Sequence, residues 1–319
     1  MLTLDDIRAA HDAIRPHVHR TPIITSRAVD ELVGAAVTFK CENFQRGGSF
    51  KIRGALNAVL SLSEQGAANG VATHSSGNHG AALAIAAGIR GIPAYIVVPA
   101  NAPRVKRAAI EGYGGIITQC AANVPARVAA LNEVIARTGA HFVPPYDDAR
   151  IVAGQATATV ELLEQAPGLE QIWVPVGGGG LAAGAAVAAR WIAPRVKVVA
   201  AEPSGADDAF RSLANGRIEP MNNPKTIADG LLTPLGIINF DILSTHGVTV
   251  ELASEGAIIA ATRLLFERMK LVVEPSGAVP LAALREASSS RRARRIGVIL
   301  SGGNVDLDAL LGKLSVADL

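Results

Sequence analysis

Short β-prone runs alternate with alanine-rich helical stretches along most of the chain from Val71 onward. These runs read VATHSS, AYIVVP, GIITQC, HFVPP, QIWVPV, KVVAAE, VTVEL and IGVILS. Strands that alternate with helices indicate β-α-β units and a mostly parallel sheet. Continuously apolar runs such as AYIVV are typical of sheets that are covered on both faces. Upstream, AVTFKCE alternates Val37, Phe39 and Cys41 with polar residues, which predicts a half-buried strand.

The length of 319 residues allows two globular units of about 150 residues each. A (β/α)₈ barrel needs evenly repeated units, and the region Ala206–Gly247 breaks the repeat. Its central part, GRIEPMNNPKTIADGLLTPLG, is rich in Gly, Pro and Asn and predicts a long loop. We therefore predict the α/β class, with two open, mostly parallel α/β domains and a cleft between them.

Composition excludes several classes of protein. Hydrophobic residues make up 49% of the chain and charged residues 18%, which argues against disorder. The net charge of +2 gives no sign of a nucleic-acid or membrane partner. The N-terminus MLTLDDIRAA carries acids where a signal peptide carries basic residues, and no apolar run has the length of a membrane span. We expect a soluble cytoplasmic protein.

The strongest local motif is IWVPVGGGGLAAG, in which four glycines, Gly177–Gly180, separate a β-prone run from an alanine-rich stretch. Glycine permits positive φ and lets the backbone approach a ligand closely. Amides at a helix N-terminus favour an anion. The motif predicts a phosphate-binding turn, and a tight strand-to-helix turn is the alternative. Gly178, Gly180 and Ala183 also match the G-x-G-x-x-A dinucleotide pattern, with Glu202 as its acidic residue.

A second polar turn, THSSGNHGAALA, leads from a strand into a helix with Ser75, Ser76, Asn78 and His79. N-capping explains one of these polar residues, not four, so the turn is a candidate carboxylate site. SGGNVD, residues 301–306, follows another apolar strand, and the pentapeptide EPSGA occurs twice. Ligands of open α/β sheets bind at the carboxyl ends of strands. These turns can therefore converge on one cleft, into which the Lys51 side chain of SFKIRGA can also project.

Five motifs together resemble a known family. SFKIRGA, SSGNHG, VPVGGGGLAAG, EPSGADDA and SGGNVD come in the order found in fold-type II pyridoxal-phosphate enzymes. The match is similar to the group of serine racemase, threo-3-hydroxyaspartate dehydratase and serine/threonine dehydratase, and it displaces the dinucleotide interpretation. It implies a tryptophan synthase β-like fold with the cofactor between the domains. Residues 1–65 and 148–319 would form a large domain and residues 66–147 a small mobile one, in a homodimer.

The resemblance implies a role for each cofactor-binding residue. Lys51 would form a Schiff base with pyridoxal 5′-phosphate, Phe50 would lie by its ring and Asn78 would bond its 3′-oxygen. The phosphate would bind Gly177, Gly178, Gly179 and Gly180, and Ser301 would face the ring nitrogen. A Schiff-base lysine must be available as a neutral amine, which desolvation favours. A neutral serine at the ring nitrogen weakens the electron sink, so prompt loss of a β-leaving group is favoured over transamination.

The resemblance also implies substrate contacts. The Ser75–His79 loop would bind the α-carboxylate through Ser75, Ser76, Asn78 and His79. Arg127 would meet the distal end of the substrate, where a cation suits a β-carboxylate, and Thr233 would lie near the substrate hydroxyl. Ser76 would be an acid/base group on the ring face opposite Lys51. The alternatives are a capping or solvated hydroxyl for Ser76 and a surface helix residue for Arg127.

A divalent cation site is the last implied feature. Glu202, the Ala206 carbonyl and Asp208 would be its protein ligands, and oxygen ligands suit Mg²⁺ or Ca²⁺, with Mn²⁺ a further option. The alternative is that Asp207 and Asp208 only open a helix and favour its dipole.

The implied activity is elimination of water from a 3-hydroxy amino acid, namely L-threonine, L-serine or 3-hydroxyaspartate, to give a 2-oxo acid and ammonia. A serine or aspartate-type racemase with dehydratase side activity is the alternative within the family. A nicotinamide-dependent oxidoreductase and a catalytically silent binding protein are the alternatives outside it.

Overall fold

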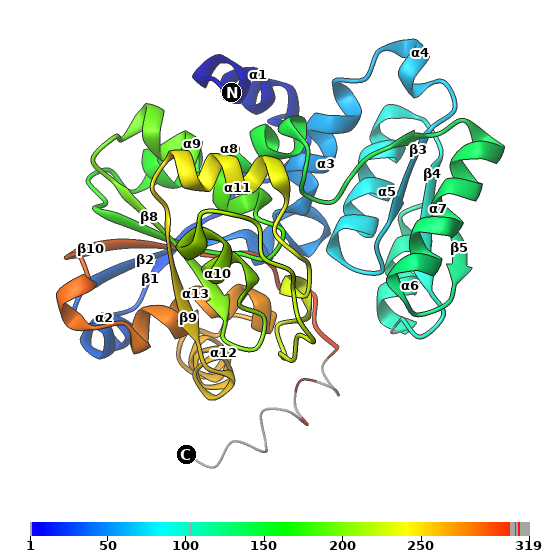
Figure 1. Cartoon of the computed structure of the whole chain (residues 1–319). Helices are drawn as coiled ribbons and strands as arrows, with labels where there is room; N and C mark the ends of the chain where they lie inside the picture. Colours follow the sequence, from blue (N-terminus) through cyan, green and yellow to red (C-terminus); the bar gives the residue numbers. More distant parts are fainter. Residues whose placement is uncertain (1, 103, 307–309, 311, 313–319) are drawn as a thin grey trace.

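The strands form two separate sheets, one in each lobe of the molecule (Figure 1). The structure, a computed structural model, describes residues 2–102, 104–306, 310 and 312. The strands are β1 Ile23–Thr25, β2 Ala36–Cys41, β3 Val71–His74, β4 Ala94–Pro99, β5 Ile116–Cys120, β6 His141–Phe142, β7 Gln171–Pro175, β8 Lys197–Pro203, β9 Thr249–Ala253 and β10 Arg295–Leu300.

Helices connect the strands and cover the sheets. They are α1 Leu4–Ile14, α2 Arg27–Val33, α3 Lys51–Leu60, α4 Glu64–Ala67, α5 Asn78–Arg90, α6 Arg104–Gly112, α7 Val124–Thr138, α8 Ala149–Gln165, α9 Gly180–Ile192, α10 Asp208–Asn215, α11 Ile237–Thr245, α12 Glu255–Met269 and α13 Pro275–Glu286. Four of them end at a glycine in the left-handed conformation: Gly34, Gly91, Gly139 and Gly216.

The larger sheet has six strands in the order β1-β2-β10-β7-β8-β9. Within the part of the chain that the structure describes, β1–β2 is the one antiparallel pair of this sheet. Trp173 on β7 lies in a core shared with α12 and α13, while α8 and α9 pack on the opposite face of the sheet. The prediction of a mostly parallel α/β architecture with two units is confirmed.

The smaller sheet has four parallel strands in the order β5-β4-β3-β6. One face packs against α3 and α5 through residues such as Ile96, and the other packs against α7 through Val97. The continuous apolar run of β4 is therefore explained by helices on both faces, as predicted. Helix α3 lies between the two lobes (Figure 1).

The structure differs from the sequence prediction in two places on the larger sheet. Strand β1 was not predicted, because three residues are too few for a recognisable alternation. Strand β2 was predicted to be half-buried, but Lys40 on its polar side is fully buried. The predicted loop Gly216–Gly236 contains only the 3₁₀ turn Asp229–Leu231. Within the described residues, no helix combines the length and the apolar character that a membrane crossing requires.

Candidate active site

Lys51 is the first residue of α3 and its side chain is half-buried. Its Nζ atom donates a hydrogen bond of 2.8 Å to the Pro145 carbonyl and lies 5.1 Å from the centre of the Phe50 ring. Burial lowers the pKa of the Lys51 amine to about 8, although the Glu274 carboxylate acts in the opposite direction. The positive end of the helix dipole also disfavours the ammonium form. A neutral amine is therefore accessible near neutral pH. The Phe50 N–H donates to the Ser301 carbonyl at 3.0 Å, which holds the start of α3 beside the SGGNVD turn.

The four-glycine turn joins β7 to α9, as the motif predicted. A Cβ atom on Gly178 would lie 2.3 Å from the Tyr146 ring, and Gly179 has φ +92°. Side chains at these two positions would meet the ring or strain the backbone, so the sequence requires glycine here. The turn lies at the N-terminus of a helix of 13 residues, where an anion is favoured, and it packs against Tyr146 and Asn239.

Two side chains from the following loop and helix fix this turn. The Gly178 N–H donates to Thr233 Oγ1 at 3.0 Å, and Asn239 Nδ2 donates to the Gly178 carbonyl at 2.6 Å. Thr233, predicted to lie near a substrate hydroxyl, thus contacts the glycine turn directly. Asn239 was not singled out in the sequence.

The segment Pro145–Asp148 links Lys51 to the glycine turn. Pro145 accepts the bond from Lys51, and the Tyr146 ring packs on Gly178. Asp147 accepts hydrogen bonds from the first two N–H groups of α11, and Asp148 caps α8. The segment follows the smaller sheet and precedes α8, so it is one of the connections between the lobes. Because neighbouring residues of one short segment contact both motifs, the Lys51 amine and the turn belong to one site.

The Ser75–His79 loop follows β3 at its carboxyl end and runs into α5. The Ser75 N–H donates to the Val97 carbonyl at 3.1 Å, and Ser76 is half-buried. The His79 imidazole is only 3% exposed, with Nε2 3.2 Å from the Val143 carbonyl oxygen. Burial and the charge of Lys51 lower the pKa of His79 to about 3. The imidazole is therefore neutral and enclosed, so the His79 backbone N–H in the first turn of α5 is the better candidate to meet a carboxylate.

Asn78 is fixed from both ends of its amide. Its Nδ2 atom donates to both oxygens of Glu274, at 2.9 and 3.1 Å, and its Oδ1 atom accepts from Asn304 Nδ2 at 3.0 Å. Glu274 is buried, and burial raises its pKa to about 7 despite the bond from Asn78. Glu274 begins the second copy of the pentapeptide EPSGA. The repeat is therefore the one sequence feature that could have indicated a role for Glu274.

Replacing Glu274 with glutamine should remove a pH-dependent part of the stability. The folded-state pKa of about 7 lies above the ordinary 4.5, so the folded protein holds this proton more tightly than the unfolded chain. The associated stability is fully present below pH 4.5 and is lost as the pH rises to 7. We expect the melting temperature of the wild type relative to Glu274→Gln to fall across this window, whereas fully exposed Glu64→Gln should track the wild type. Parallel melting curves for wild type and Glu274→Gln would contradict this assignment.

Glu202, near the end of β8, and Asp208, the first residue of α10, form a buried acidic pair. Both Glu202 oxygens accept N–H groups of α10, from Ala209 at 3.0 Å and Phe210 at 2.8 Å. Asp208 Oδ2 accepts the Leu235 N–H, and its Oδ1 atom is buried without a hydrogen-bond partner. Burial raises the pKa of Glu202 to about 8, and burial also raises that of Asp208.

Two buried carboxyl groups and one orphaned oxygen fit an added cation that would stabilise their charged forms. Among the described residues, no group of three or more His, Cys, Asp or Glu side chains could hold a metal. The predicted site instead combines two carboxylates with a backbone carbonyl, that of Ala206. Glu202 is 1% exposed and both of its oxygens accept N–H groups of α10, so it is not placed to bind a ribose hydroxyl.

Arg127 lies in the first turn of α7 and is half-buried. Its Nε atom is buried without a hydrogen-bond partner. Burial is the main cause that lowers the pKa of His74, the last residue of β3, and the positive charge of Arg127 is the second cause. Arg127 is therefore near the carboxyl end of β3, where the Ser75–His79 loop begins.

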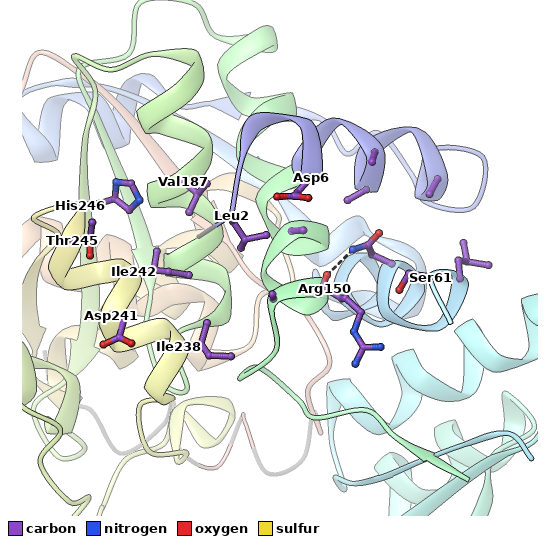
Figure 2. Close-up of a pocket in the computed structure, with 17 residues that line it drawn as sticks. Leu2, Asp6, Ser61, Arg150, Val187, Ile238, Asp241, Ile242, Thr245 and His246 are labelled. Carbon is purple, nitrogen blue, oxygen red and sulfur yellow. Dashed lines mark hydrogen bonds between the residues drawn. The ribbon is translucent and has the colours of Figure 1, made fainter. Parts of the chain in front are cut away.

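A cavity of about 770 Å³ lies elsewhere, between α1, α3, α8 and α11 (Figure 2). Leu2, Val187, Ile238 and Ile242 supply apolar walls. None of the described residues that line it belongs to the predicted site. This cavity is therefore not the candidate active site, which we place at Lys51.

Comparison with known proteins agrees with this geometry. The sequence pattern of the family described as "Pyridoxal-phosphate dependent enzyme" matches residues 14–302. The chain belongs to this family. It is 47% identical over 308 residues to a beta-hydroxyaspartate dehydratase of Paracoccus denitrificans (strain Pd 1222), covering 97% of this chain and 98% of the relative. A serine racemase of Dictyostelium discoideum is 45% identical, with 97% of each chain covered. The structure of maize serine racemase superposes with a TM-score of 0.94 at 43% identity, covering 98% of this chain and 97% of that one.

This pyridoxal-phosphate enzyme thus has the tryptophan synthase β-like fold of fold type II. The residues present fit the cofactor, because a four-glycine turn at a helix N-terminus and a half-buried lysine with a lowered pKa lie in the same site. The nicotinamide-dependent alternative is displaced by the family match.

Proposed function

We propose that this enzyme eliminates water from a 3-hydroxy amino acid and yields a 2-oxo acid and ammonia. The observation that carries the proposal is the Lys51 amine, which is half-buried, has a lowered pKa and is hydrogen-bonded beside the glycine turn. The similarity to a hydroxyaspartate dehydratase and to serine racemases supports the same class of substrate. Racemisation of serine or aspartate is the second candidate, favoured by a serine at position 76.

Each residue of the site has a stated part in this reaction. Pyridoxal phosphate, when bound, withdraws electrons from the substrate Cα and so makes its proton removable. The glycine turn and the N-terminus of α9 hold the phosphate, and Asn78 orients the ring edge. The amides at the start of α5 hold the α-carboxylate. The Lys51 amine would hold the cofactor covalently, and as a free amine it would take the Cα proton as the general base.

Ser76 should decide the balance between racemisation and elimination. Racemisation needs a proton donor on the face opposite Lys51, whereas elimination needs only the base. Ser76→Ala should therefore lower racemisation by about 10²-fold or more while elimination changes by about threefold or less. Chiral analysis of recovered serine, together with keto-acid release from the same samples, measures both. An equal loss of both reactions would assign Ser76 to substrate binding instead.

The test of the proposed activity is a panel of L-serine, L-threonine and the 3-hydroxyaspartate stereoisomers, assayed for ammonia and 2-oxo acid. We propose that Arg127 binds a β-carboxylate, so 3-hydroxyaspartate should be the preferred substrate. Arg127→Ala should raise the KM for 3-hydroxyaspartate about 10- to 100-fold and leave serine within about twofold, as expected for a lost charged hydrogen bond. Arg137→Ala, an exposed position on the same helix, is the matched control. Release of ammonia from none of these substrates would overturn the dehydratase proposal.

A bound divalent cation at Glu202, the Ala206 carbonyl and Asp208 is also proposed. Removal of the metal by a chelator should lower both the melting temperature and the activity, since two buried carboxylates would then face each other unneutralised. Mg²⁺ should restore both, and Asp208→Asn should abolish the response to Mg²⁺. Unchanged melting and activity after exhaustive chelation would contradict the site.

Two further expectations complete the proposal. We propose that residues 66–147 move as a small domain against residues 1–65 and 148–319. The Lys106–Asp229 ion pair, which joins α6 to the turn Asp229–Leu231, would then hold the lobes together. We also propose a homodimer located in the cytoplasm.

A further inference from the structure

Arg53 is the centre of a fully enclosed charge network two residues after Lys51. Its guanidinium group forms bidentate pairs with Glu42, at 2.8 Å from Nε and from Nη2, and with Glu161, at 2.8 and 2.9 Å. Nη1 also donates to Thr157 Oγ1 at 3.2 Å, and Nη2 to the His19 carbonyl at 3.4 Å. All donors of the guanidinium fork are thus used.

Lys40 completes the network. Its Nζ atom donates to Glu161 at 2.6 Å, to the Thr21 carbonyl at 2.8 Å and to Gln165 at 2.8 Å. Burial acts to raise the pKa of Glu161, but the hydrogen bonds and charges of Arg53 and Lys40 hold it below its ordinary value. The two cations and two carboxylates therefore sum to zero net charge within the core.

The network joins α3 to the nearby end of β2 and to α8, whose Glu161 lies 108 residues after Arg53. Glu42 directly follows β2 of the larger sheet, Glu161 lies on α8, and Arg53 lies in the first turn of α3. The helices meet closely at this point, since a Cβ atom on Gly154 would lie 2.5 Å from the Arg53 carbonyl oxygen. The first turn of α3 cannot tilt without disturbing α8.

Lys51 and Arg53 lie on opposite faces of α3, because two residues correspond to a rotation of about 200° around a helix. Arg53 is anchored on the inner side, while Lys51 extends to Pro145. Stability alone does not account for such a network, since apolar residues of similar volume often stabilise a core equally well. Planar bidentate pairs do fix an orientation, which apolar contacts do less sharply.

We propose that Arg53 is a positioning residue for Lys51, which holds the first turn of α3 so that the lysine amine points at the cofactor site. The proposal rests on the role proposed above for Lys51. Catalytic groups must be held closely, because a displacement of about 1 Å can lower a rate about 10²-fold. Lys40 stabilises the same network from β2 and has no direct attachment to α3.

The experiment compares Arg53→Lys with Lys40→Met in purified holoenzyme. Arg53→Lys keeps the charge and loses the planar fork. It should lower kcat about 10²-fold with KM changed about threefold or less. It should also shift the pH midpoint of the visible cofactor band by about half a unit or more, because the environment of the Lys51 nitrogen changes. Lys40→Met leaves both bidentate pairs of Arg53 in place, so it should lower the melting temperature and change the band midpoint and kcat less than Arg53→Lys does.

A pair of mild variants on α8 covers the case in which Arg53→Lys does not fold. Thr157→Val removes one bond to Arg53 and should lower kcat about two- to fivefold, with a band shift in the same direction. Thr159→Val is the matched control, since the Thr159 hydroxyl is buried without a hydrogen-bond partner. It should change neither quantity.

A lower melting temperature with unchanged band and kcat, in Arg53→Lys or in Thr157→Val, would overturn the positioning role. The Lys51 role is tested separately in the wild type by borohydride reduction and peptide mapping. A wild type in which no cofactor is fixed to Lys51 overturns the proposed function, whatever the Arg53 variants do.

Discussion

Lys51→Ala should lower the rate of ammonia release about 10³-fold or more, because it removes the residue proposed as both the covalent attachment point and the general base. The visible absorption of the purified enzyme should also change, since the cofactor can then bind only non-covalently. Borohydride treatment followed by peptide mapping should label residue 51 in the wild type and give no labelled peptide in the variant. The measurements are single-turnover ammonia release and mass spectrometry of the reduced protein.

The control for this experiment is Lys197→Ala, at an exposed lysine on β8. It should retain wild-type labelling and turnover. A Lys51→Ala enzyme that still turns over at a tenth of the wild-type rate or better would remove Lys51 from the mechanism.

Gly178→Ala should have the second largest effect. The added methyl group would lie 2.3 Å from the Tyr146 ring, so the ring or the turn must move. Overpacking of this kind costs about 1–3 kcal/mol, which sets an upper limit of roughly 5- to 150-fold on the loss of cofactor affinity if the phosphate binds here. Titration of the cofactor-free protein with pyridoxal phosphate, followed by its absorption, gives the dissociation constant.

Gly88→Ala on α5 is the matched substitution, because a Cβ atom there meets no atom within 4 Å. It should leave the affinity unchanged and stabilise the helix by up to about 1 kcal/mol. Equal cofactor affinity for Gly178→Ala and the wild type would exclude the turn as the phosphate site.

Local patterns made much of the architecture predictable. Strands β3 to β10 lie where the alternation of the sequence placed them. The glycine turn was predictable for the same reason, since its chemistry is contained in one continuous stretch. Lys51 could be chosen because its motif comes in order with four others.

Contacts across long sequence separations were not predictable. The burial of Lys40 depends on Glu161, which lies 121 residues away, and no local pattern reveals that partner. Glu274 meets Asn78 across 196 residues, and Tyr146 meets Gly178 only through the return of the chain between the lobes. The enclosed position of His79 follows from its packing beside Val143, which a polar motif at a helix start does not disclose.

The short stretch Pro145–Asp148 connects four parts of the candidate site to one another. Each of its residues is attached to a different working part: the lysine amine, the glycine turn, the start of α11 and the start of α8. If the proposed small domain rotates, this segment links its movement to the Lys51 amine and to the glycine turn. Opening of the cleft and release of the base would then be a single event, and this stretch would tolerate insertions as poorly as the interior of a strand.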